Sequence, residues 1–190
     1  ILLVCEFQDL TCLLVSIPRI LSFHPSAVEL LSFGRLSSGQ LQHNEKGLTD
    51  FPTIYVEFSG ESLTTLEQRA DLCRSALRQS CISSEVLSDR ASCNAAWNER
   101  RNSLNHILRF SDGSKKAIGI IEDTIVNPSL LEEYIPFIQG IYNRYKLDYV
   151  MYGHIGNGNI HTRPLIDAQS TMAVEIIEHL AHDVFSKVRE

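Results

Sequence analysis

The chain has 190 residues, of which 44% are hydrophobic and 21% charged, a composition typical of a globular domain with one sizeable core or two small ones. Its net charge of -6 and its lack of any Lys- and Arg-rich run argue against a nucleic-acid groove or an anionic membrane as the main partner. Five cysteines form an odd set without a C-x-x-C pair, which favours reduced thiols and a cytoplasmic location, with peripheral membrane association as the alternative.

The first third of the chain predicts strands around one helix. A short apolar run predicts a strand over residues 1–7, and because the chain starts inside this run without Met, we expect a segment of a longer protein. Apolar residues at helical spacing predict a helix over 10–23, interrupted at Pro18. Two further strands are predicted over 26–33 and 53–60, separated by a polar, Gly-bearing loop over 36–52.

Helices and strands also mix in the rest of the chain. Ser62 is a predicted helix cap, and Asn127 is a second one, followed by Pro128 in the first helical turn. Residues 81–108 read as part connection and part helix. The other predictions are strands over 115–126, 148–156 and 159–166 and a final helix over 170–188. This order predicts an α+β fold with one mostly antiparallel sheet and helices packed on one face.

The stretch YVMYGHIGNGNIHTR at 149–163 predicts a polar hairpin. Asn-Gly between two strand-like runs is the strongest short-range signal for a type I′ turn, here at Asn157 and Gly158. With that turn, His154 faces His161 and Tyr152 faces Arg163. Asn159 shares the face of His161 and Arg163, and Ile155 and Ile160 lie behind it, toward the core.

This polar face has two interpretations from spacing alone. Two neutral imidazoles side by side can bind a divalent metal such as zinc if a third ligand arrives from elsewhere. A solvated outer face of the sheet would carry the same residue types. Glu122 and Asp123 together could form a paired-carboxylate site, but because adjacent strand residues point to opposite faces, at most one of them should face a cleft.

Four motifs carry a resemblance to a known family. YGHIGNGNIH resembles the G-H-x-G-[DN]-G-N-x-H signature of the C-terminal domain of FAD-linked oxidases, the group that includes glycolate oxidase large subunits, D-lactate dehydrogenases and D-2-hydroxyglutarate dehydrogenases. HPSAVELL resembles the family's P-x-A-x-E-[LF] strand, AAWNERR its W-x-x-R helix entry, and IIEDTIVNPSLLEEYI its E-D-x-x-V-P-x-x-L segment. The four occur in the family's order and span essentially the whole chain.

The resemblance implies the substrate or cap domain of a flavoenzyme, of ferredoxin-like derivation, over residues 1–190. His154 and His161 match the family's metal ligands, Asn159 lies beside them on the substrate and cofactor side, and Arg163 matches a substrate-side position. Arg100 matches the arginine that clamps a substrate carboxylate, although Arg101 beside it is an alternative. The family's E-H-G segment, with a carboxylate ligand and a candidate base, should lie beyond residue 190. We therefore expect no complete catalytic set in this chain.

Two functions follow as hypotheses. The first is the substrate-binding part of an FAD-dependent dehydrogenase or oxidase that oxidises a D-2-hydroxy acid by hydride transfer to flavin, with FAD held mainly by a separate domain. Its expected partners are the hydroxy acid, the FAD-binding domain, an electron-transfer protein and a second copy of the chain in a homodimer. The second is a free-standing metal- or ligand-binding α+β domain without redox activity.

Overall fold

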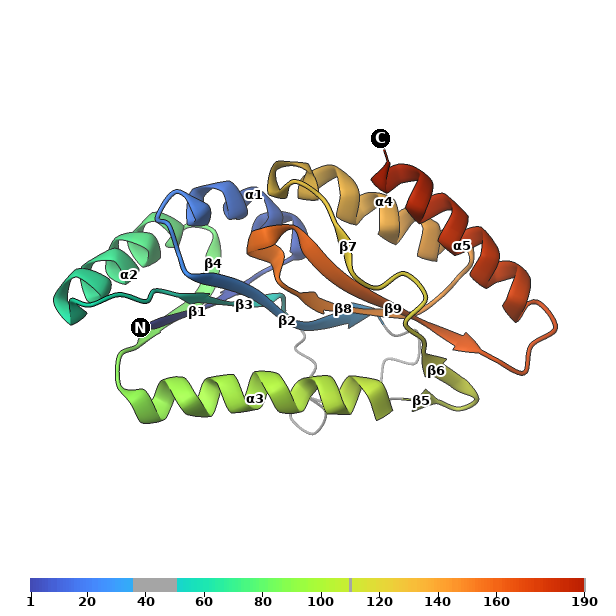
Figure 1. Cartoon of the computed structure of the whole chain (residues 1–190), viewed down its shortest axis with the longest axis horizontal. Coiled ribbons are helices and arrows are strands. Elements are labelled where there is room, and N and C mark those ends of the chain that lie inside the picture. Colours follow the sequence, from blue (N-terminus) through green and yellow to red (C-terminus); the bar gives the residue numbers. More distant parts are fainter. Residues whose placement is uncertain (36–50, 110, 190) are drawn as a thin grey trace.

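The computed structural model describes residues 1–35, 51–109 and 111–189, and within them the chain forms an antiparallel sheet with helices on both faces (Figure 1). All of the strand pairs are antiparallel, so the predicted α+β class is confirmed. Most of the loop predicted over 36–52 lies outside the described residues.

The strands follow the order β4-β1-β3-β2-β8-β9-β6-β5 across the sheet, and β7 also pairs with β9. Some neighbouring strands are far apart in sequence, since β2 pairs with the late strand β8 as well as with β3. The strands are β1 (Leu2–Phe7), β2 (Ala27–Arg35), β3 (Thr53–Glu57), β4 (Cys81–Leu87), β5 (Ser111–Asp112), β6 (Lys115–Ala117), β7 (Thr124–Ile125), β8 (Tyr149–Gly153) and β9 (Asn159–Asp167).

Two helical segments begin at the side-chain caps that the sequence predicts. Ser62 accepts a hydrogen bond from the Thr65 amide, and Asn127 accepts one from the Ser129 amide, so both predicted caps are confirmed. Such bonds satisfy amides that the first turn of a helix leaves without a partner. The helices are α1 (Leu10–Leu21), α2 (Leu63–Leu77), α3 (Arg90–Arg109), α4 (Leu131–Arg144) and α5 (Ala173–Val188), with short 3₁₀ turns η1 (Pro128–Leu130) and η2 (Ile155–Asn157).

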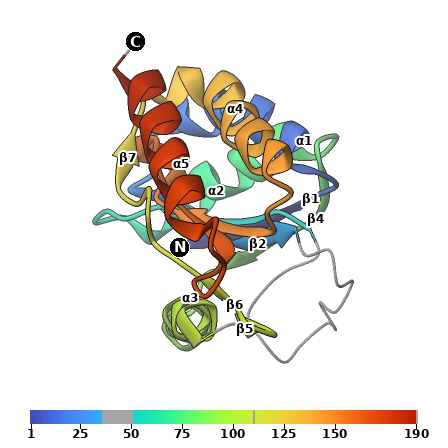
Figure 2. The same ribbon diagram turned by 90° about the vertical axis from the view of Figure 1, so that its right-hand side faces the viewer.

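The helices divide unequally between the two faces of the sheet. Figures 1 and 2 show α1, α2, α4 and α5 on one face and α3 alone along the other. The prediction that the helices pack on one face was therefore wrong for α3. The large core lies under the four helices, whereas a small cluster that includes Leu2, Leu31, Tyr55 and Ala96 packs against α3. Trp97 completes that cluster edge-on to Tyr55, with ring centroids 5.7 Å apart. A helix on the second face turns that face into a partly enclosed surface.

Strand β2 shows how alternation directs a charged residue to the α3 face. Val28 and Leu30 are buried in the large core. Glu29, between them, points the opposite way and is only 7% exposed. A carboxylate at that position lies under α3, where it needs charged or hydrogen-bonding partners.

The predicted strand over 115–126 is broken in the structure. Within 115–126 only β6 and the two-residue β7 form strands, each paired with β9, and the residues between them follow an irregular path. Asp123 lies in this path with φ of 60°, a left-handed conformation that ends regular pairing. Among the described residues, no helix combines the length and the apolar character that crossing a bilayer requires.

Candidate functional site

The hairpin between β8 and β9 differs from the predicted type I′ turn. Strand β8 ends at Gly153, the chain makes the 3₁₀ turn η2, and Gly158 follows with φ of 73°. Tyr152 therefore lies opposite His161, so the predicted pairs His154–His161 and Tyr152–Arg163 were wrong. The longer turn moves the register by two residues, and a two-residue shift leaves every side chain on its original face.

The predicted distribution over the two faces is confirmed. Ile155 and Ile160 are fully buried in the large core, while the imidazoles lie on the α3 side. His154 has left the strand, yet its ring meets that of His161 in an edge-to-face arrangement, with centroids 5.7 Å apart. The two imidazole rings are therefore neighbours, although His154 and His161 are not paired across the strands.

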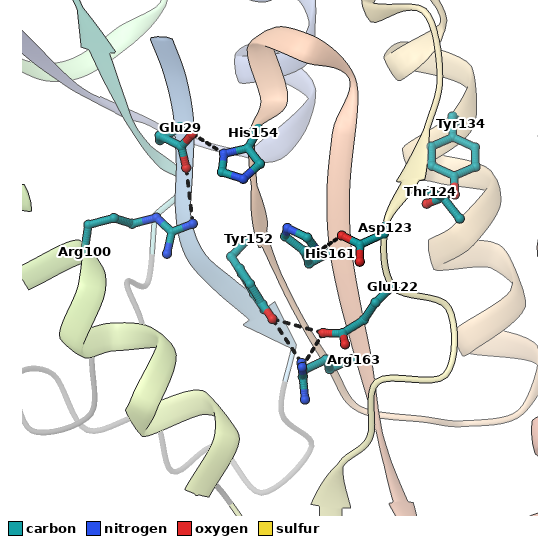
Figure 3. Close-up of polar contacts among 10 residues, drawn as sticks. All are labelled: Glu29, Arg100, Glu122, Asp123, Thr124, Tyr134, Tyr152, His154, His161 and Arg163. Atoms are coloured by element: carbon teal, nitrogen blue, oxygen red, sulfur yellow. Dashed lines mark hydrogen bonds and ion pairs between the residues drawn. The ribbon is translucent and has the colours of Figure 1, made fainter.

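Each histidine uses its Nδ1 atom to contact a carboxylate. His154 Nδ1 hydrogen-bonds Glu29 Oε1, and His161 Nδ1 lies 3.3 Å from Asp123 Oδ1. An ionised carboxylate can only accept, so Nδ1 of His154 carries the hydrogen in its bond to Glu29, and Nε2 keeps its lone pair when the ring is neutral. Figure 3 shows the second nitrogen of each ring directed toward the other histidine.

Arg100 reaches the same place from α3. Its Nη2 lies 3.2 Å from Glu29 Oε2, and its guanidinium lies over the Tyr152 ring, 5.6 Å from the centroid (Figure 3). The side chains of Arg100 and Glu29 are only 11% and 10% exposed. Arg101, in contrast, is exposed and contacts Asn98 on its own helix. Of the two candidate clamps, Arg100 is therefore the one at the site.

Arg163 and Tyr152 form a second polar group with Glu122. Arg163 Nη2 forms an ion pair with Glu122, and Arg163 Nε donates to the Tyr152 hydroxyl at 3.0 Å. Tyr152 in turn donates to Glu122 at 3.1 Å. Burial raises the pKa of Tyr152, so the hydroxyl keeps its proton for this bond. The charge of Arg163 is thereby offset within the chain.

The whole chain is similar to a known protein family. Residues 1–190 match the model of the C-terminal domain of FAD linked oxidases. The chain belongs to this family. Its HPSAVELL segment forms β2 with Glu29, its AAWNERR segment lies on α3 with Arg100, and its His-to-His segment forms the hairpin.

Similar curated proteins come from several bacteria. The chain is 27% identical over 136 residues to the D-2-hydroxyglutarate dehydrogenase of Haemophilus influenzae, a match that covers 68% of this chain and 13% of that protein. It is 29% identical over 119 residues to the enzyme of the same name from Pantoea ananatis, covering 59% of this chain and 12% of that protein. For the Escherichia coli enzyme of that name the identity is 26% over 136 residues, 68% of this chain and 13% of that protein. The matches thus span a small part of these relatives' length.

In this FAD-linked oxidase domain, the electrostatics favour neutral imidazole at His161. Burial lowers the pKa of His161 below its ordinary value, Asp123 opposes the shift, and the neighbouring His154 adds to it. A neutral ring keeps the lone pair that a metal or a proton needs. Within 1–35, 51–109 and 111–189, however, no three His, Cys, Asp or Glu side chains are placed to hold a metal together.

Asn159 has a buried acceptor beside the histidines. Its Oδ1 atom is shielded from solvent and has no hydrogen-bond partner within the described residues. Burying such an atom without a partner is costly.

Sequence analysis missed the role of Glu29 and expected only one of Glu122 and Asp123 at the site. Glu29 was predicted only as part of a strand, although a lone acid inside an apolar strand signals a buried polar contact. The rule that at most one of Glu122 and Asp123 faces the cleft was wrong. Glu122 contacts Arg163 and Asp123 contacts His161, because the left-handed backbone at Asp123 breaks strand alternation.

Proposed function

We propose that this chain is the substrate-binding part of an FAD-dependent oxidoreductase that oxidises a D-2-hydroxy acid by hydride transfer to flavin. Family membership and the names of the relatives support this reading. The observation that carries it is the convergence of Arg100, His154 and His161 on one face of the sheet, under α3. When bound, FAD supplies the hydride acceptor, and the residues here supply binding and orientation.

Arg100 is the proposed partner of the substrate carboxylate. A guanidinium offers planar, paired donors that match a carboxylate, and burial strengthens such a contact. Glu29 and the Tyr152 ring hold the group in place from two sides. Arg163 is the proposed second polar residue on the substrate side, and Asn159 Oδ1 is the proposed acceptor for a hydroxyl or N–H of substrate or cofactor.

His154 and His161 are the proposed protein ligands of a divalent metal such as zinc. The fit is partial, because their second ring nitrogens face one another while the described residues bring no third ligand (Figure 3). A bound cation would polarise the hydroxyl of a 2-hydroxy acid. We infer that the third ligand and the proton acceptor come from outside these residues. An FAD-binding domain, an electron-transfer partner and a homodimer also remain predictions.

The alternative is a metal- or ligand-binding α+β domain without redox activity. It would use the same histidines and Arg100 but would need no flavin. Its support is limited to the chain's own fold and polar face, since the relatives are named as dehydrogenases.

The test uses the complete gene product. Under anaerobic conditions, adding a D-2-hydroxy acid is expected to bleach the flavin absorbance, whereas the L enantiomer is not. The chain of residues 1–190 alone is expected to purify colourless and inactive. A complete product without flavin, or one whose flavin no 2-hydroxy acid reduces, would favour the alternative.

A further inference from the structure

Glu29 belongs to the HPSAVELL segment, for which the resemblance gave no role at the site. Its two carboxylate oxygens serve two different donors, Oε1 for His154 Nδ1 and Oε2 for Arg100 Nη2. The partners come from distant parts of the chain, 125 and 71 residues away. Figure 3 shows the carboxylate of β2 between the arginine of α3 and the imidazole that follows β8.

We propose that Glu29 is a positioning residue that fixes His154 as the Nδ1–H tautomer while it holds Arg100 against the sheet. The inference rests on the proposed function, because it explains how the metal-side and carboxylate-side groups of that site are held together. The carboxylate accepts from Nδ1, so the hydrogen stays there and Nε2 faces His161 with its lone pair available. Loss of that tautomer would place a hydrogen where a cation or proton must bind.

The bridge that Glu29 forms between Arg100 and His154 needs two acceptor atoms, which only a carboxylate provides. A Glu29→Gln side chain has nearly the same shape, but it has one oxygen and one NH₂ group. Arg100 can only donate, so the single oxygen must go to Arg100. The NH₂ group then faces His154, and the ring can receive it only if its hydrogen moves to Nε2. The substitution is therefore expected to invert the tautomer of His154.

Asp123 provides a matched control at the second histidine. Its side chain is 79% exposed, and its Oδ1 atom lies 3.3 Å from His161 Nδ1. An Asp123→Asn side chain can still turn its one oxygen toward His161, so the tautomer of His161 is expected to remain as in the wild type. Asn also tolerates the left-handed backbone at this position, where φ is 60°.

The experiment is a long-range ¹H–¹⁵N correlation spectrum of the ¹⁵N-histidine-labelled chain, without flavin, metal or substrate. It is recorded about two pH units above the ordinary histidine pKa of about 6.5. The bare and the hydrogen-bearing ring nitrogens have well-separated shifts. We expect Nδ1–H at His154 in the wild type, Nε2–H in E29Q, and an unchanged His161 in D123N. Backbone amide spectra show whether each variant is folded.

A double variant tests the role of Arg100 in the bridge. In E29Q/R100M the glutamine oxygen no longer has to serve an arginine, so His154 is expected to shift back toward Nδ1–H. A wild-type His154 that is mainly Nε2–H overturns the proposal even if E29Q does not fold, and so does a folded E29Q with an unchanged tautomer. If the inverted tautomer of His154 persists fully in the double variant, the proposal that Arg100 and His154 compete for the single glutamine oxygen is overturned. Because no turnover is measured, these outcomes are independent of the flavin assay that tests the proposed function.

Discussion

Tyr152 lies directly opposite His161 across β8 and β9, and the two rings stack with centroids 5.0 Å apart. The tyrosine hydroxyl is held by Arg163 and Glu122, so the ring that covers His161 has a fixed position. One face of the imidazole is therefore occupied by protein, and its edge contacts Asp123 and His154. The orientation of His161 therefore depends on Arg163, two residues further along β9, and on Glu122, because both hold the Tyr152 ring.

Tyr152→Phe should destabilise the chain by about 1–2 kcal/mol, because two hydrogen bonds to charged groups are lost while Arg163 and Glu122 still pair with each other. Urea unfolding followed by circular dichroism measures the effect. Tyr145→Phe is the control, since the Tyr145 hydroxyl has no hydrogen bond within the described residues, and it should change stability little. Equal losses in the two variants would mean that the Tyr152 hydroxyl contributes nothing specific.

Arg100→Lys in the complete protein should lower kcat/KM for a D-2-hydroxy acid roughly 10- to 150-fold, because lysine keeps the charge but loses the planar fork of a contact worth about 1.5–3 kcal/mol. Flavin content, measured by absorbance, should stay near the wild-type value. Arg101→Lys is the matched control on the same helix and should have little effect, since Arg101 is exposed. A parallel loss of flavin and turnover in Arg100→Lys would indicate a structural role instead.

Gly158→Ala should be far more destabilising than Gly113→Ala, although both glycines have positive φ, 73° and 61°. A Cβ at Gly158 would lie 1.8 Å from the Val126 carbonyl oxygen, whereas one at Gly113 meets nothing within 4 Å. The left-handed backbone costs about 1–2 kcal/mol at each site. The collision should add about 1–3 kcal/mol at Gly158 alone. Midpoints of urea unfolding for the two variants give the difference, and similar midpoints would contradict it.

Cys81 should be alkylated by iodoacetamide faster than Cys12, although both side chains are partly buried. A hydrogen bond from the Cys5 thiol lowers the pKa of Cys81, whereas the neighbouring Asp9 raises the pKa of Cys12. The thiolate is the reactive form, so the lower pKa gives the larger reactive fraction at a given pH. Burial raises the pKa of Cys73 to about 11, which should make Cys73 slower still. Peptide mapping after short pulses on the folded chain measures these rates, and Cys12 reacting first would contradict the assignment.

The local pattern of the sequence determined which side chains share a face. Ile155 and Ile160 are in the core, and His161 and Arg163 are on the opposite face, as the period of two predicted. This prediction survived a wrong turn type because a two-residue change of register does not alter the face of any residue. The caps at Ser62 and Asn127 were also predictable, because they depend on residues two or three positions away.

Only the tertiary structure decided how the site is held together. Glu29 joins Arg100 and His154 because β2 lies beside β8 and α3 crosses the second face, and neither fact follows from local spacing. Asp123 reaches His161 because the chain leaves regular strand geometry there, in a backbone conformation that residue patterns do not reveal. Local periodicity determines the face of a side chain, whereas contacts between residues 71 or 125 positions apart depend on the order of strands in the folded sheet.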